Sequence, residues 1–89
     1  MTKNALWLRI DGTQVTQGLQ EACVKLEGCE GEAVLDFSGV SRVDAKAVQA
    51  LEDFAAKAAA ASVKPVLHGV QANVYRVLML TNLASRFAM

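Results

Sequence analysis

One histidine, two cysteines and no glycine-rich loop leave this 89-residue sequence with little of the chemistry that enzymes and metal sites use. Cys23 and Cys29 lie six residues apart, and no second pair completes a zinc site or a disulfide framework. The six glycines never fall in the Gly-x-Gly-x-x-Gly or Walker pattern, which argues against ordinary nucleotide binding. No nucleophile motif accompanies His68. We therefore predict a non-enzymatic protein with no catalytic residues, no metal site and no cofactor.

Net charge is lacking as well. Nine Lys and Arg residues balance nine Asp and Glu residues, so no overall field attracts nucleic acid or an anionic membrane. The start of the chain carries only a short apolar stretch at residues 5–8, and no uncharged apolar run approaches the roughly 20 residues that span a bilayer. These absences predict a cytoplasmic protein without membrane insertion, which recognises a partner through local contacts.

Apolar residues, in contrast, make up 53% of the chain. A domain this small buries only roughly 60–65% of the surface that its unfolded chain exposes, so it has to use nearly every apolar stripe. The length fits one domain over residues 1–89 and leaves no room for a second core.

The hydrophobic pattern alternates between two kinds of segment. Short apolar runs bounded by turn residues predict strands at residues 5–10, 33–37 and 65–70. Apolar positions that recur every three to four residues predict helices at residues 15–28, 44–61 and 74–81. The strand-helix order, repeated three times, predicts an α/β fold in which helices pack on a mixed or mostly parallel sheet.

Single residues refine this pattern. Asp44 suits the N-cap of the long helix, Pro65 the start of the third strand, and Asn82 a left-handed turn after the last helix. Cys23 falls in the apolar stripe of the first helix, which predicts a small buried side chain in preference to a reactive thiol. We expect His68 to be partly exposed or hydrogen-bonded on its strand.

The polar turn at residues 38–44 joins the second predicted strand to the longest helix. Loops at the carboxyl ends of parallel strands usually carry the site in this architecture, so we expect it at residues 41–47. Lys46 opposes the helix dipole by something like 0.3–1 kcal/mol when exposed, and Arg42 places a second cation nearby. Lys46 is either a solvated lysine whose cost is tolerated or a contact to an acidic partner surface.

Four pieces of the sequence together resemble the STAS domain, the fold of anti-sigma factor antagonists. They are residues 35–40, Val43-Asp44 with the long helix, residues 65–70 and residues 77–83. The resemblance implies a STAS-like α/β fold and a module that binds a protein partner. Known members include anti-sigma factor antagonists, stressosome subunits, cytoplasmic ends of anion transporters and a small subunit of ABC-type lipid transporters. Residues 38–44, Gly69-Val70 and Val74-Tyr75 look closest to the lipid-transport subunit.

The sequence departs from the phospho-switched members at one position. They carry a Ser or Thr after the residue that matches Asp44, whereas this chain has Ala45, which cannot accept the roughly 1.5–2 negative charges of a phosphate. We therefore predict no kinase-controlled switch there, while Ser38 and Ser41 remain open as acceptors. By resemblance, the partner-binding residues are Ser41, Arg42, Asp44, Ala45 and Lys46.

Three functions stay open at this point. The first is a regulatory relative of the anti-sigma factor antagonists, whose partner is an anti-sigma factor or kinase-like regulator. The second is a constitutive STAS subunit that binds the ATPase of an ABC-type lipid transporter, and the third is a small nucleotide-binding domain. The region before the first helix holds one predicted strand where the family often has two. An uncovered sheet edge or apolar patch predicts a homodimer, with Trp7 at the interface, in the core or at the rim of the core.

Overall fold

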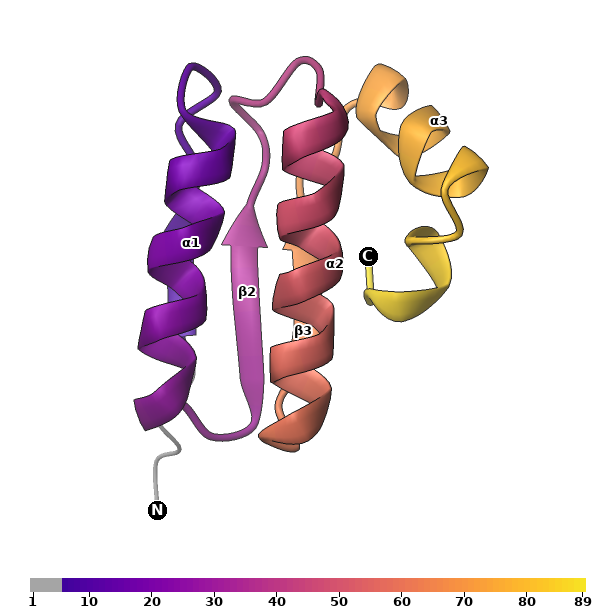
Figure 1. Cartoon of the computed structure of the whole chain (residues 1–89). Helices are drawn as coiled ribbons and strands as arrows, with labels where there is room; N and C mark the ends of the chain where they lie inside the picture. The colour runs from indigo at the N-terminus through magenta and orange to yellow at the C-terminus, as the bar shows by residue number, and fades with distance from the viewer. Residues whose placement is uncertain (1–5) are drawn as a thin grey trace.

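The computed structural model of the protein describes residues 6–89 (Figure 1). Three parallel strands form one sheet in the order β1-β2-β3: β1 (Leu6–Arg9), β2 (Glu32–Asp36) and β3 (Lys64–His68). Three α-helices follow them in turn: α1 (Val15–Lys25), α2 (Ala45–Ala60) and α3 (Ala72–Leu80). The predicted α/β architecture is confirmed, although residue 5 of the first predicted strand lies outside the described residues.

The core lies between one face of the sheet and the two long helices. Figure 1 shows α1 and α2 side by side over the same face of the sheet. On the central strand and just after it, Ala33, Leu35 and Phe37 are fully buried, whereas Val34 and Asp36 alternate with them toward the other face. Full burial of a Leu or Phe side chain contributes roughly 1.5–3 kcal/mol, so this single layer supplies much of the stability.

The opposite face of the sheet carries one polar row and one apolar row. Register places Arg9, Asp36 and His68 in one row across the three strands, and Trp7, Val34 and Val66 in the row before it. The Trp7 ring, which is 57% exposed, packs against the exposed His68 ring with 5.3 Å between centroids. Trp7 is therefore not a core residue, and the homodimer stays a prediction.

The end of the chain adds a contact that the sequence analysis missed. After α3, Asn82 has a φ of 65°, which confirms the predicted left-handed turn. A 3-10 helix, η2 (Ala84–Arg86), follows, and the Ala88 backbone then pairs with β3. Ala88 donates its N–H to the Pro65 carbonyl at 3.0 Å, and Leu67 donates to the Ala88 carbonyl at 2.8 Å. A second 3-10 helix, η1 (Leu26–Gly28), ends α1.

Gly12 brings the first strand-to-helix turn against the second one. A Cβ on Gly12 would collide with the Gly39 carbonyl oxygen, whereas a Cβ on Gly28 would meet nothing within 4 Å. We expect Gly12→Ala to lower the free energy of unfolding by about 1–3 kcal/mol, as overpacking does. Gly28→Ala is the matched control and should change it little. Urea unfolding of both variants measures the difference, and equal midpoints would disprove this close contact of the two turns.

Candidate partner-binding site

Aspartate side chains that accept backbone hydrogen bonds shape the turns that follow β1 and β2. The Asp36 carboxylate accepts the Ser38 N–H at 2.9 Å, and the Asp11 carboxylate accepts the Thr13 N–H at 2.8 Å. These backbone hydrogen bonds lower the pKa of Asp36 and of Asp11 from the usual 3.8, because they favour the ionised form. Both turns therefore have a set shape at neutral pH.

The next residues attach the turn to the core. The Val40 N–H donates to the Phe37 carbonyl at 2.9 Å, and the Val40 side chain is fully buried. Val43 is half-buried and packs against the core cluster. The chain between them is thus held at two points while its polar side chains face solvent.

Asp44 begins the long helix as predicted. Its backbone is extended, and its carboxylate accepts the Ala47 N–H at 2.8 Å, which satisfies one of the free donors at the start of α2. The Asp44 carbonyl accepts the Val48 N–H at 2.9 Å. The cap fixes Ala45 and Lys46 in the first helical turn.

The structure brings the five predicted site residues to one exposed corner. This corner, at the carboxyl-end edge of the sheet, consists of Ser41, Arg42, Asp44, Ala45 and Lys46, all of which are exposed. We call these five residues the α2 corner. Their exposure makes them accessible to another protein, and their role in binding stays a prediction.

A second loop supports the α2 corner from the side of β3. The Gln71 side-chain amide donates to the Ser38 carbonyl at 3.0 Å, although the two residues are 33 positions apart in the sequence. Gly69 has a φ of +72°, and a Cβ there would lie 3.0 Å from the Ser38 Cβ. The loop before α3 is therefore packed directly on the turn that leaves β2.

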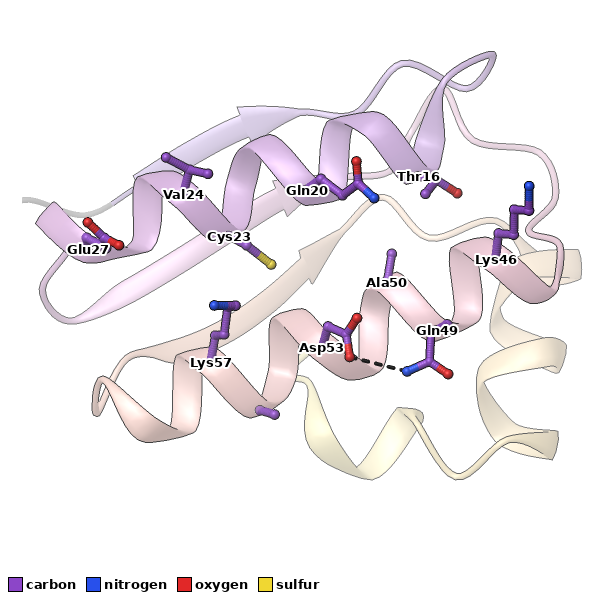
Figure 2. Close-up of a pocket in the computed structure, with 11 residues that line it drawn as sticks. Thr16, Gln20, Cys23, Val24, Glu27, Lys46, Gln49, Ala50, Asp53 and Lys57 are labelled. Carbon is purple, nitrogen blue, oxygen red and sulfur yellow. Dashed lines mark hydrogen bonds between the residues drawn. The ribbon is translucent and has the colours of Figure 1, made fainter.

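A groove between α1 and α2 starts beside the α2 corner (Figure 2). It has a volume of about 670 Å³ and is lined by Lys46 at one end and by Lys57 and Glu27 toward the other. Asp53 accepts a hydrogen bond from Gln49 at 3.2 Å within it. A neighbouring hollow of about 660 Å³ is lined by Arg42 and Asp44, together with the start of α1. Neither the groove nor the hollow could be predicted from the sequence, because helical periodicity does not indicate how far apart two helices lie.

Cys23 lies in this groove, and its exposure differs from the prediction. The prediction of a buried side chain is wrong: Cys23 is only half-buried, and Figure 2 shows its sulfur directed toward α2. Desolvation raises the pKa of the thiol, a shift that the nearby Lys57 opposes and Asp53 reinforces. A raised pKa keeps the thiol protonated, which disfavours a role as a nucleophile.

Comparisons with known proteins identify the family of this chain and a structure with a similar fold. The family model of the STAS domain matches residues 3–89. The chain belongs to the STAS domain family. The crystal structure of a candidate anti-sigma factor antagonist from Thermotoga maritima is similar, with a TM-score of 0.78 over 99% of this chain and 80% of that one. At 15% sequence identity, this likeness concerns the fold alone. No curated protein matches the chain.

Within residues 6–89, no group of three or more His, Cys, Asp and Glu residues could hold a metal ion. In the same range, no helix has both the length and the apolar character needed to cross a membrane. The exposed Arg42 and Lys46 lie on either side of the capped helix start, where both are accessible to another protein.

The lowered pKa of Asp36 can be measured directly. The Asp36 carboxyl should titrate below 3.8 in a carbon-detected NMR experiment on the folded protein. Because the folded-state pKa lies below the unfolded value, Asp36 favours the folded state above pH 3.8, and this contribution disappears as pH falls through the lowered pKa. A midpoint at or above 3.8 would contradict the hydrogen-bonded turn.

The Asp44 cap predicts that replacing Asp44 destabilises the protein more than replacing Asp53, which lies further along the same helix. Asp44→Ala removes the bond to Ala47 and should lower the free energy of unfolding by about 1 kcal/mol, while Asp44→Ser should restore most of it. Asp53→Ala is the control, because Asp53 is exposed and bonds only the Gln49 side chain. Chemical unfolding of the three variants tests this, and an Asp44→Ala protein as stable as Asp53→Ala would rule out the cap.

Proposed function

We propose that this STAS domain is a non-enzymatic regulatory module of the cytoplasm that binds an anti-sigma factor through the α2 corner. The observation that carries the proposal is the exposure of five neighbouring residues at a capped helix start, on a turn tied to the core at Val40. Membership of the family and the likeness to a candidate anti-sigma factor antagonist support this type of partner.

The charges of the α2 corner indicate what the partner presents there. Arg42 and Lys46 are exposed cations, and the single carboxylate between them, Asp44, is engaged by the Ala47 N–H. An acidic partner surface would meet two cations and one carboxylate whose charge the helix start partly offsets. Such complementarity mainly raises the association rate and fixes the orientation of the complex.

Ala45 makes the binding independent of phosphorylation at that position. It is the first residue of α2 and is exposed, so it would lie within the interface without a hydroxyl that a kinase could modify. A kinase therefore cannot control the proposed module at Ala45, whereas the exposed Ser38 and Ser41 still carry hydroxyls.

The first test reverses the two cations of the α2 corner. Arg42→Glu combined with Lys46→Glu should weaken binding to the anti-sigma factor by about tenfold or more, which corresponds to roughly 1.4 kcal/mol. Lys25→Glu with Lys64→Glu is the matched control, with the same change of net charge at exposed positions outside both the corner and the groove. Titration calorimetry gives both affinities. Equal affinities for the two double variants would refute the α2 corner as the binding site.

A second test adds a negative charge at the position of the absent acceptor. Ala45→Asp places a carboxylate at the start of α2, where it favours the helix by about 0.3–1 kcal/mol. It should nevertheless lower the affinity for an acidic partner, whereas the neutral Ala45→Asn should lower it less. Unfolding and binding measured together separate the two effects, and unchanged binding of Ala45→Asp would count against an acidic partner at this point.

The identity of the native partner distinguishes the remaining functions. Purification of the protein from its own cells with an anti-sigma factor or kinase-like regulator supports the proposal. Purification with the ATPase of an ABC-type transporter would instead assign it to a lipid-transport complex, which would use the same exposed corner. Saturable stabilisation by a nucleoside triphosphate in a thermal-shift assay would favour the nucleotide-binding alternative.

A further inference from the structure

The short helix α3 exposes three large apolar side chains. Tyr75 is 45% exposed, Met79 55% and Leu80 80%, on a helix of only nine residues. Tyr75 and Met79 are one turn apart, as are Arg76 and Leu80, so these four side chains form two adjacent stripes. We call them the α3 face.

The α3 face is not needed to hold the helix in place. Val74 and Leu78 are fully buried, and the Leu83 side chain after the helix is also in the core. A surface helix would ordinarily carry polar residues opposite its buried stripe. Tyr, Met and Arg are instead the residue types enriched in protein interfaces, and Tyr and Arg are the frequent energetic centres of such interfaces.

The charged residues in the last part of the sequence, which contains α3, are all basic. All nine acidic residues of the chain lie between Asp11 and Asp53, whereas Lys57, Lys64, Arg76 and Arg86 come after them. The sequence is neutral overall, but its last 36 residues, which contain α3, carry four basic side chains and no acidic one. The α3 face thus combines apolar side chains with the cation of Arg76. Its charge is positive, as is the net charge of the α2 corner.

The helices that carry the two surfaces begin at the same end of the molecule. α2 and α3 each begin at the carboxyl-end edge of the sheet (Figure 1), and the bond from Gln71 to the Ser38 carbonyl ties the start of α3 to the turn before α2. A specific interface takes roughly 800 Å² from each partner, contributed by about 20–30 residues. The five residues of the α2 corner fall short of this, so a complex needs a second contact area nearby.

We propose that the α3 face is the second half of the partner-binding surface, and that the partner is a protein with an acidic surface and an apolar ridge that covers Tyr75, Met79 and Leu80. This inference rests on the proposed function, because it concerns the same partner. The cations of the α2 corner and Arg76 set the orientation, and burial of the apolar side chains supplies most of the affinity.

Site-specific photocrosslinking in the native cells tests the two surfaces separately. We would place p-benzoylphenylalanine at Met79 on the α3 face, at Ala45 in the α2 corner, and at Val24 on α1 as a control. Val24 is also an apolar residue, 69% exposed, on the helix that lies on the other side of α2, and it lines the groove at the end away from Lys46. Mass spectrometry of the adducts then identifies each captured protein and the captured peptide.

The inference expects the same protein, captured through an acidic peptide, at residues 79 and 45 but not at 24. Capture of a partner at position 45 but not at position 79 would be consistent with the proposed function and would contradict the role of the α3 face in binding. Capture of different proteins, or of a second copy of this chain, at 79 would also overturn it. No adduct at 45 or 79 would count against both proposals.

Paired substitutions give an affinity readout for the same surface. Met79→Ser with Leu80→Ser should weaken binding of the captured protein at least about tenfold, with unfolding unchanged because both side chains are exposed. Val24→Ser is the control and should bind like the parent protein. Binding unaffected by the Met79 and Leu80 changes, while Arg42→Glu with Lys46→Glu weakens it, would reject the α3 face and retain the α2 corner.

Discussion

The structure depends on the burial of only one face of its sheet. α1 and α2 cover Ala33, Leu35 and the following Phe37, and the other face carries charged residues such as Arg9 and Asp36 in register. Parallel sheets are usually covered on both faces, which makes their strands continuously apolar. Here the strands alternate instead, because α1 and α2 cover only one face of the described sheet. The uncovered face, which includes the exposed Trp7, thus remains accessible, as do the edge of the sheet and the outer sides of the helices.

The alternation and the local end signals explain why most of the fold could be predicted. Asp44 caps α2 with its own side chain, and Asn82 takes the left-handed conformation after α3, so both features are encoded within a few residues. The ends of individual strands are less well encoded in the sequence: β2 begins at Glu32, one residue earlier than predicted. The STAS assignment rested on the order of several weak motifs, and the match over residues 3–89 confirms it.

The missed features all depend on contacts between distant parts of the chain. The Ala88 pairing with β3 follows from the burial of Phe87, whose ring stacks on that of Phe54 with 6.3 Å between centroids. Gln71 reaches Ser38 across 33 residues, and no local pattern marks either one as a partner. Cys23 fits the apolar stripe of α1, yet it borders an open groove because α1 and α2 do not close over it. Periodicity predicts which face of a helix is apolar, but it does not predict how much of that face a neighbour covers.

The rigidity of the α2 corner bears on how strongly it can bind. The chain just before the corner is held by the turn at Asp36 and by Val40, and the corner itself is held by the half-buried Val43 and the Asp44 cap. A partner therefore does not have to order the loop, and the loss of conformational freedom is confined to long side chains such as Arg42 and Lys46. Immobilising such a side chain costs about 0.5–1.5 kcal/mol, which is comparable to the gain from an exposed ion pair. The cations of the corner thus contribute mainly to orientation and association rate, and tight binding requires apolar burial that the corner itself does not offer.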